Sequence, residues 1–333
     1  MSQIVVIAIG GNSLIRSGEK GSVAEQLANA RRTAATIVGL IRRGHRLVLT
    51  HGNGPQVGAQ LLRSDRARDQ VPGQTLDVCG AASQGEIGYI LSQSLNNELA
   101  AAGLTVPVVS VITQTIVSGD DPAMTQPTKP IGPFYSRAEA IEREQRLGWK
   151  IVEDAARGYR RVVPSPEPIE IVELDVIRGL VEQGALVIAC GGGGIPVVRM
   201  NGGLRGVEAV IDKDRASALL ASLLGVDTLV ISTGPRFVYL DYKMPTMRPL
   251  ARATASEAER FLKAGQFPAG SMGPKVEAAL QFLRKGGKEV IITSCQYLGQ
   301  AIEGSDGTHI IPDGEPLGPD VVTSHGGESV SAK

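Results

Sequence analysis

The chain has 333 residues, and its 34 lysine and arginine residues balance 34 aspartate and glutamate residues. This balance and an aromatic content of only 4% disfavour a nucleic-acid-binding protein, and the zero net charge gives no bulk attraction to an anionic membrane. No apolar run is long enough to span a bilayer, and the apolar stretch at residues 4–9 is too short for a signal peptide. We therefore expect a cytoplasmic protein with a sizeable core.

Short β-branched runs alternate with helical stretches, an order typical of a largely parallel sheet that helices cover on both faces. The predicted fold class is therefore α/β. In chain order, the expected strands are 4–9, 46–50, 106–112, 186–189, 228–233 and 289–293. The expected helices are 22–43, 79–102, 171–183, 213–224, 254–264 and 274–286.

Two proline- and glycine-rich segments interrupt this alternation. Residues 118–135 and 159–168 are predicted to be loops, with a polar helix between them at about 136–147. Together they predict a small subdomain over about 118–168 that protrudes from the sheet as a lid. We predict a single domain over 1–316, followed by a flexible tail over 317–333.

Cysteines and histidines give no sign of a metal site. Cys79, Cys190 and Cys295 are far apart and odd in number, so they form neither a metal-binding spacing nor a disulfide framework. We expect reduced, buried thiols. The four histidines form no cluster flanked by carboxylates, which disfavours zinc, and the sequence leaves the ligands of any metal unknown.

Glycine-rich turns follow three of the expected strands, at Gly10-Gly11-Asn12, Gly52-Asn53-Gly54 and Gly191 to Gly194. In an open α/β sheet, ligands bind beyond the carboxyl ends of the strands, and backbone N–H groups in such turns favour phosphate. The chain has neither a P-loop motif nor a G-x-G-x-x-G fingerprint. The turns predict a phosphate cradle of another kind, although tight turns without a ligand would use the same glycines.

Three lysines, each close to proline, glycine or aspartate, are candidates for binding a negatively charged ligand. Lys213, between Asp212 and Asp214, and Lys275 are each expected at a helix start, where the helix dipole is positive. Lys129 lies in the predicted lid. Lysines so placed suit a bound polyanion, and phosphoryl transfer relies on such charge neutralisation. No Ser-His-Asp or Cys-His set is evident, which disfavours hydrolysis through a covalent intermediate.

A series of motifs, in this order, resembles the motifs of carbamate kinases over residues 4 to about 312. They are Ala8–Leu14, Thr50–Gly58, Pro127–Tyr135, Arg160–Pro166, Cys190–Pro196, Gly206–Asp214 and Gly270–Ala278. The resemblance implies a three-layer α/β/α sandwich of the amino-acid kinase superfamily and a homodimer. It also implies the Mg²⁺-dependent reaction ADP + carbamoyl phosphate ⇌ ATP + carbamate, mainly toward ATP synthesis.

The same resemblance implies roles for individual residues. Lys129, Lys213 and Lys275 would contact the transferring phosphoryl group, and Asp214 would orient the lysines. The substrate would be held by Gly10, Gly11, Asn12, Gly52, Asn53, Gly54, Gly192 and Gly193. The nucleotide would be bordered by Asp212, Lys213, Thr233, Tyr242, Met272 and Lys275, in a nucleotide-side lobe over about 226–316.

One segment departs from the family pattern. Gly234-Pro235-Arg236 stands near the expected nucleotide site, where these kinases usually carry an apolar residue and an acid. Arg236 would either add a phosphate or ribose contact or face solvent. Two alternatives to a carbamate kinase are a kinase of another small acid in the same superfamily and a non-catalytic ligand-binding subunit. The pathway is open between arginine fermentation, purine or allantoin breakdown and other sources of carbamoyl phosphate.

Overall fold

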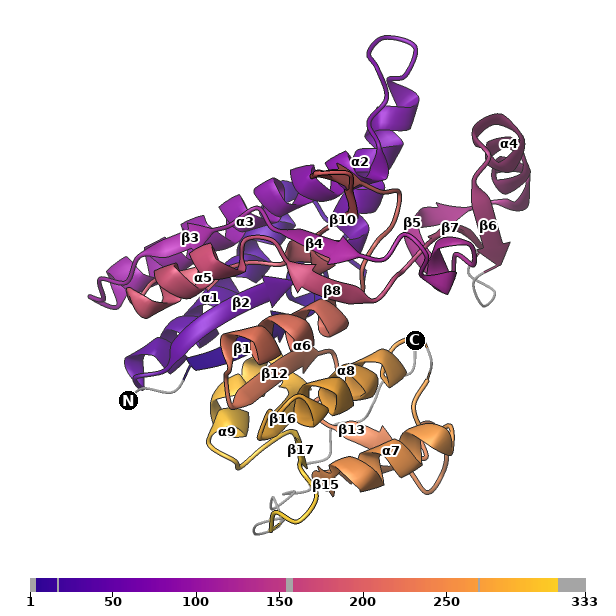
Figure 1. Cartoon of the computed structure of the whole chain (residues 1–333). Helices are drawn as coiled ribbons and strands as arrows, with labels where there is room; N and C mark the ends of the chain where they lie inside the picture. The colour runs from indigo at the N-terminus through magenta and orange to yellow at the C-terminus, as the bar shows by residue number, and fades with distance from the viewer. Residues whose placement is uncertain (1–3, 17, 154–157, 269, 317–333) are drawn as a thin grey trace.

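A computed structural model describes residues 4–16, 18–153, 158–268 and 270–316 (Figure 1). The predicted tail over 317–333 lies outside these residues. An eight-stranded sheet has the order β15 (Arg252–Thr254), β17 (Thr308–Ile311), β16 (Glu289–Ser294), β12 (Thr228–Thr233), β1 (Ile4–Ile9), β2 (Arg46–His51), β9 (Leu186–Ile188) and β3 (Val108–Ser110). The strands from β16 to β3 are parallel, whereas β17 is antiparallel to β16 and parallel to β15.

Helices cover both faces of this sheet. One face packs against α1 (Val23–Arg42), α3 (Leu76–Ala101) and α9 (Leu298–Ile302). The other packs against α5 (Leu174–Glu182), α6 (Lys213–Leu224), α7 (Ala255–Lys263) and α8 (Gly273–Arg284). Successive strand residues point to opposite faces, so that Val230 joins the first core and Ile231 the second. The predicted three-layer α/β/α sandwich is confirmed.

The expected elements of these layers are found, with some differences at their ends. The helix expected over 171–183 begins at Leu174, because Ile171 ends a short strand, β8 (Pro168–Ile171). Helix α2 (Gly54–Arg66) was not predicted. It begins directly at the glycine turn after β2, with Pro55 in its first turn. Proline is tolerated there because the N–H groups of the first turn have no partner within the helix.

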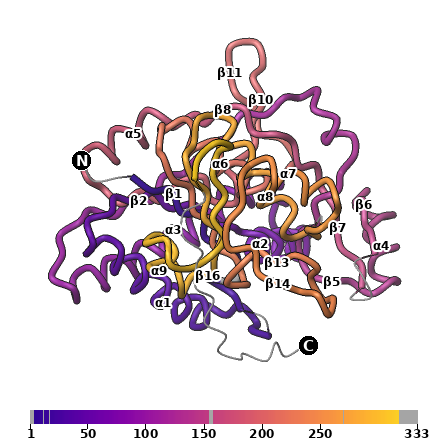
Figure 2. Tube along the Cα trace, turned by 90° about the horizontal axis from the view of Figure 1, so that it is seen from below, coloured from indigo at the N-terminus to yellow at the C-terminus, as the bar shows by residue number. Residues whose placement is uncertain are grey.

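Two smaller sheets were also not predicted. A four-stranded sheet has the order β11 (Gly203–Gly206), β10 (Ile195–Met200), β4 (Gln114–Val117) and β8, and its β10–β11 hairpin projects from the body (Figure 2). The neighbouring strands β3 and β9 of the large sheet continue into β4 and β10, which are again neighbours. Strands β13 (Val238–Leu240) and β14 (Arg248–Leu250) form an antiparallel pair.

The predicted lid region is a protruding subdomain, but part of it is sheet rather than loop (Figure 1). Strands β5 (Lys129–Tyr135), β7 (Tyr159–Val163) and β6 (Lys150–Glu153) are antiparallel neighbours, and the expected helix is α4 (Arg137–Leu147). The loop prediction was therefore wrong for β5 and β7, and β6 was not predicted. The prolines of β5 are tolerated because β5 lies at the sheet edge and its pairing with β7 is irregular between Ile131 and Tyr135.

The lid is seated directly on α2. Gly132 of β5 has a φ of +73°, and a Cβ added at Gly58 of α2 would overlap its Cα atom. Backbone therefore meets backbone at this contact, which requires glycine. Inside the lid, Arg143 lies 4.3 Å from the ring centroid of Tyr135. The lid therefore has contacts within itself, and its buried residues Ile131 and Val163 also pack in one cluster with Val57 and Leu61 of α2.

The three cysteines are free. Cys79 and Cys190 are buried as expected, whereas Cys295 is only half-buried, and burial raises the pKa of each thiol. None of the helices in the described part of the chain is long and apolar enough to cross a membrane.

Candidate active site

A cavity of about 1030 Å³ lies beyond the carboxyl ends of β1, β2 and β12, where a parallel sheet places its ligands. Most of the residues predicted for the site line it. They are Gly11, Gly52, Asn53, Gly54, Lys129, Gly192, Asp212, Lys213, Asp214, Thr233, Tyr242, Met272 and Lys275. Segments far apart in the sequence thus meet around one space.

Two predicted glycines lie behind the cavity wall instead. A Cβ added at Gly10 would be 2.8 Å from the Ser232 carbonyl oxygen, and one added at Gly193 would be 2.6 Å from the Ile211 oxygen. Both positions thus allow a close approach of two backbone segments. Asn12 belongs to a 3₁₀ turn, Gly11–Ser13, and its side chain lies outside the described part of the structure.

The turn from Cys190 to Gly194 has a backbone that glycine adopts readily and other residues rarely do. Gly192, Gly193 and Gly194 have φ values of 66°, 94° and 88°, and Cys190 has a φ of 50°. A Cβ at Gly192 would overlap the side-chain amide of Asn53. The missing side chain therefore lets the Asn53 amide pack against the backbone of Gly192, which itself lines the cavity.

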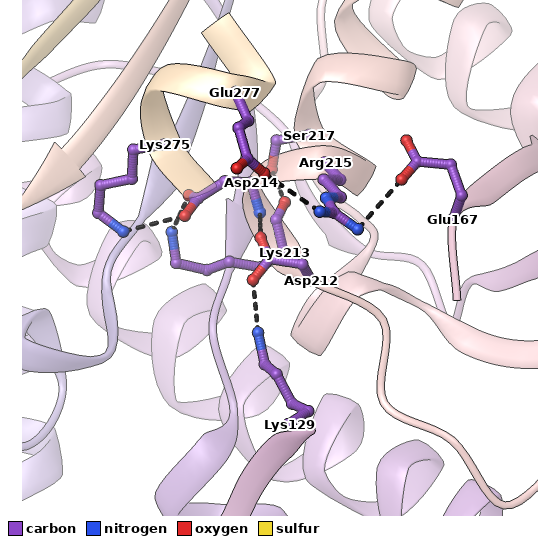
Figure 3. A network of polar contacts seen from close by, with 9 residues as sticks. All are labelled: Lys129, Glu167, Asp212, Lys213, Asp214, Arg215, Ser217, Lys275 and Glu277. Carbon is purple, nitrogen blue, oxygen red and sulfur yellow. Dashed lines mark hydrogen bonds and ion pairs between the residues drawn. The ribbon is translucent and has the colours of Figure 1, made fainter. Parts of the chain in front are cut away.

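Lys213, Asp214 and Lys275 form a cation–carboxylate–cation cluster (Figure 3). Lys213 begins α6, and Lys275 lies in the first turn of α8, which packs against α6. One Asp214 oxygen is paired with the Lys213 ammonium, and the other lies 2.9 Å from the Lys275 ammonium. Asp214 is thus paired with both lysines at once.

Burial and mutual attraction compete in this cluster. Burial lowers the pKa of Lys213, and the Asp214 carboxylate opposes that effect. For Asp214, burial favours the neutral form, but the ammonium groups of Lys213 and Lys275 outweigh burial and hold its pKa well below the usual range. The carboxylate is therefore charged at neutral pH, between two cations.

Lys129 connects the lid with the start of α6. Its ammonium is paired with an Asp212 oxygen, while the other Asp212 oxygen accepts a 2.9 Å hydrogen bond from the Asp214 N–H (Figure 3). Burial alone would raise the pKa of Asp212, yet Lys129 contributes to holding it below its usual value. Asp212 therefore caps α6 and holds the lid lysine at once.

Sequence reasoning missed a second ionic group at the rim. Arg215 donates to Glu277 of α8 over 3.2 Å and lies 3.2 Å from Glu167, which belongs to the connection between the lid and β8 (Figure 3). Arg215 and Glu277 line the cavity. Glu277 lies within a quoted motif and Arg215 directly follows one, but only their spatial meeting with Glu167 indicates a link between the lid base and the helix of Lys275.

His51, in the second motif, is fully buried, and its ring is neutral at pH 7. Burial lowers its pKa to about 4, and the positive charge of Lys213 adds to the effect. Its Nδ1 lies 3.0 Å from the Gly52 carbonyl oxygen, an acceptor, so this nitrogen carries the proton. The neutral ring supports the turn that lines the cavity.

Arg236, which departs from the family pattern, is paired with Asp306. Neither a nucleotide contact nor exposure to solvent, the two expectations from the sequence, includes this partner. The Arg236 Nε donates to both oxygens of Asp306, at 2.8 and 2.9 Å, and the guanidinium lies 4.5 Å from the centroid of Tyr297. Arg236 therefore neither points to the nucleotide site nor lies free in solvent. Its neighbours Gly234 and Pro235 do line the cavity.

The described residues contain no group of three or more histidine, cysteine, aspartate or glutamate side chains that could hold a metal ion. The carboxylates at the centre of the cavity, Asp212 and Asp214, are engaged by lysines. This donor set suits an anion that brings its own metal ion better than a resident metal.

Known proteins of one kind match nearly the whole chain. Residues 3–294 match the model of the amino acid kinase family. The carbamate kinase of Pyrococcus horikoshii is 48% identical over 314 residues, which are 94% of this chain and 100% of the relative. That of Staphylococcus haemolyticus is 50% identical over 313 residues, 93% and 99% of the two chains. The structure of carbamate kinase from Giardia lamblia bound to AMP-PNP has a TM-score of 0.88 at 45% identity and covers 94% of this chain and 99% of that one. The chain therefore belongs to the amino acid kinase family and, within it, to the carbamate kinases.

Proposed function

We propose that the chain transfers a phosphoryl group reversibly between carbamoyl phosphate and ADP, and that it works mainly toward ATP and carbamate. One observation carries this proposal: Lys129, Lys213 and Lys275 converge with the three glycine-rich turns on one cavity. The transition state of phosphoryl transfer spreads negative charge over three equatorial oxygens and the in-line entering and leaving oxygens. Fixed cations and backbone amides stabilise that charge distribution.

The chemistry balances without a protein base. A β-phosphate oxygen of ADP attacks the phosphorus of carbamoyl phosphate, and the bond to the carbamate oxygen breaks with its electron pair. Both the nucleophile and the leaving group are anions, so no proton has to move. The neutral, buried His51 is consistent with this, because no general base is required.

The residues that line the cavity support separate binding regions for carbamoyl phosphate and for the nucleotide. We assign the carbamoyl phosphate end to the glycine turns with Asn53, and the nucleotide end to Thr233, Tyr242 and Met272. We assign Lys213 and Lys275 to the phosphoryl group in transit, because both line the same cavity. Asp212, first predicted beside the nucleotide, is assigned here to holding Lys129.

Mg²⁺ is part of the proposal as a component of the nucleotide substrate. It is commonly bound through phosphate oxygens and one or two carboxylates, where it neutralises charge. The chain's own lysines would neutralise the oxygens that the ion leaves uncovered. Asp212, Asp214 and Glu277 are carboxylates of the cavity wall, and the first two are already paired with lysines.

The test is ATP formation from ADP, Mg²⁺ and carbamoyl phosphate, coupled to phosphorylation of glucose. We expect rapid ATP formation that depends on Lys213. A chain that binds ADP but makes ATP only from another small acyl phosphate would contradict the proposed substrate. A chain that binds ADP and forms no ATP from any acyl phosphate would be a non-catalytic subunit, although the retained lysines argue against that outcome.

We further propose that the chain forms a homodimer through the end of the sheet at β3. Exposed apolar side chains gather on the elements there: Tyr89 of α3, Ile112 after β3 and Val176 of α5, with Tyr89 64% exposed. Tyr89→Lys should give a monomer in sedimentation velocity. Ile141→Lys, at an equally apolar but remote position on the lid helix, should stay dimeric. Dimers of the Tyr89 variant would place the interface elsewhere.

The domain assignments also remain part of the proposal. Residues 118–168 would act as a lid on a single domain over 1–316, and residues 226–316 would form its nucleotide-side lobe. Support comes from the lid's separate sheet and from Thr233, Tyr242 and Met272 on the cavity wall.

A further inference from the structure

Gln84 is an uncharged side chain of α3 whose amide is bonded entirely to backbone. It is 2% exposed. Its Nε2 donates to the Gly191 oxygen at 3.0 Å and to the Thr113 oxygen at 3.1 Å, and its Oε1 accepts from the Thr113 N–H at 2.8 Å. One side chain thus satisfies three buried backbone groups, each of which would be costly to leave unpaired.

The bonded groups belong to two chain segments that cross together from the large sheet to the small one. Thr113 lies between β3 and β4, and Gly191 lies between β9 and β10. The segments also bind each other, since the Cys190 N–H donates to the Thr113 hydroxyl at 3.0 Å. Gln84 reaches both from α3, so it holds them at a fixed distance from that helix.

The second segment is the glycine turn of the cavity. The Gly193 and Gly194 N–H groups close the turn on itself, through the Cys190 and Gly191 oxygens at 3.0 and 3.1 Å. Gly192, which lines the cavity, is therefore the residue whose amide we expect to face a ligand oxygen. A hydrogen bond to Gly191 thus fixes the neighbour of the residue that meets the ligand.

The turn needs such a restraint because its conformation is strained at one end. Cys190 has a left-handed backbone without being glycine, which costs on the order of 1 kcal/mol. Strain of this kind persists where surrounding contacts determine the conformation. On the far side, the Thr115 hydroxyl donates to the Gly193 oxygen at 3.0 Å, so side chains hold two carbonyl groups of the turn.

We propose that Gln84 is a positioning residue for the carbamoyl phosphate end of the site, an inference that rests on the proposed function. It acts through the backbone of Gly191 on the placement of Gly192 and touches no reacting atom. Without its amide, the turn would relax and the ligand end would shift. A misplacement of about 1 Å is enough to cost on the order of 10²-fold in rate.

The experiment compares Gln84→Met, of similar length but without the amide, with Gln70→Met as a control. Gln70 lies in the turn between α2 and α3 and is exposed. We expect Gln84→Met to raise the KM for carbamoyl phosphate at least tenfold and to lower kcat, with the KM for ADP within twofold of the wild type. Gln70→Met should match the wild type in all three constants.

The split between the two KM values separates positioning from a merely structural role. A Gln84→Met protein that is less stable but has unchanged constants in its folded fraction would overturn the proposal, and so would equal losses for both substrates. If Gln84→Met does not fold, Thr115→Val removes a single bond to the same turn and should give the same split in weaker form; unchanged constants there would overturn the proposal.

A separate binding measurement keeps this inference apart from the proposed function. If the wild type makes no ATP from carbamoyl phosphate, the proposed function fails by itself. Calorimetric titration with inorganic phosphate then still compares the anion site of the wild type and Gln84→Met. Weaker phosphate binding by the variant would support positioning, and equal binding would overturn it.

Discussion

The two sides of the cavity are held by different kinds of interaction. On one side, the turns at Gly52 and Gly192 are backbone, and the buried uncharged side chains of His51 and Gln84 support them from behind. On the other side, lysines of the lid, α6 and α8 are paired with Asp212 and Asp214. One side is fixed by hydrogen bonds that no ligand replaces, whereas the other consists of ion pairs that a phosphate can enter.

This difference matches what the two ends of the reaction require. A small, nearly featureless substrate such as carbamoyl phosphate offers few contacts, so its place is best set in advance by rigid backbone donors. The phosphoryl group in transit needs charge that follows its changing oxygens. Substitutions on the two sides should therefore have distinguishable signatures.

The largest effect is expected on the ionic side. Lys213→Met removes a cation from the path of the phosphoryl group and should lower kcat by about 10³-fold, while the protein stays folded. Lys263→Met, on the exposed face of α7, is the matched control and should leave kcat unchanged. Coupled ATP formation measures both, and a Lys213→Met enzyme with wild-type kcat would remove the basis of the proposed mechanism.

The next effect tests the fixed side. Gly192→Ala places a Cβ against the Asn53 amide at a φ of 66°, so we expect the KM for carbamoyl phosphate to rise and kcat/KM to fall by about 10²-fold. Gly202→Ala is the control, because it too has a positive φ, 86°, but meets open space in the β10–β11 hairpin. Equal losses in both variants would mean that backbone strain, not the cavity, causes the effect.

A smaller effect is expected on the pH dependence of stability, through His51, whose neutral ring supports the turn at Gly52. The folded pKa of His51 is about 4, below its ordinary value of 6.5, so the unfolded chain binds more protons between these pH values. Stability contributed by the neutral ring is therefore complete above pH 6.5 and is lost as pH falls toward 4. Denaturant unfolding should show about 2 kcal/mol less stability from this group at pH 5 than at pH 7.

The variant His51→Gln should lack that part of the pH dependence, and His45→Gln, at the end of the α1–β2 connection, should keep it. A wild-type pH profile that His51→Gln leaves unchanged would assign the acid sensitivity to other groups.

The smallest effect is expected outside the cavity. Arg236→Lys keeps the charge but loses the paired contacts of Nε and Nη2 with the Asp306 carboxylate, which should lower stability by about 1 kcal/mol in denaturant unfolding. The KM for ADP should remain within twofold of the wild type. A large rise in that KM would show that this segment reaches the nucleotide after all.

The central layers could be predicted because each apolar strand is followed by a turn and a helix. The lid strands could not, because Pro130 and Pro133 mark loops unless the strand lies at a sheet edge. Helix α2 was hidden because its first residues belong to a glycine- and proline-rich motif.

In the site, the lysines could be recognised because they lie at helix starts, and the glycines because they follow strands. The residues that hold them in place could not be recognised. A single buried glutamine such as Gln84 has no periodic signal, and the partners Arg236 and Asp306 are 70 residues apart. Which glycines face the cavity and which face a neighbouring backbone, as Gly10 does, depends on the packing of several segments.

The pairing of Lys129 with Asp212, and of Lys213 and Lys275 with Asp214, has a consequence for turnover. The protein supplies its own counterions, so in the proposed mechanism an arriving phosphate would exchange one anionic partner of each lysine for another instead of meeting bare charge. On departure of the product, the carboxylates would be within reach and would replace it. An enzyme that must release ATP in one direction and carbamoyl phosphate in the other gains from this exchange, because it limits the residence time of both.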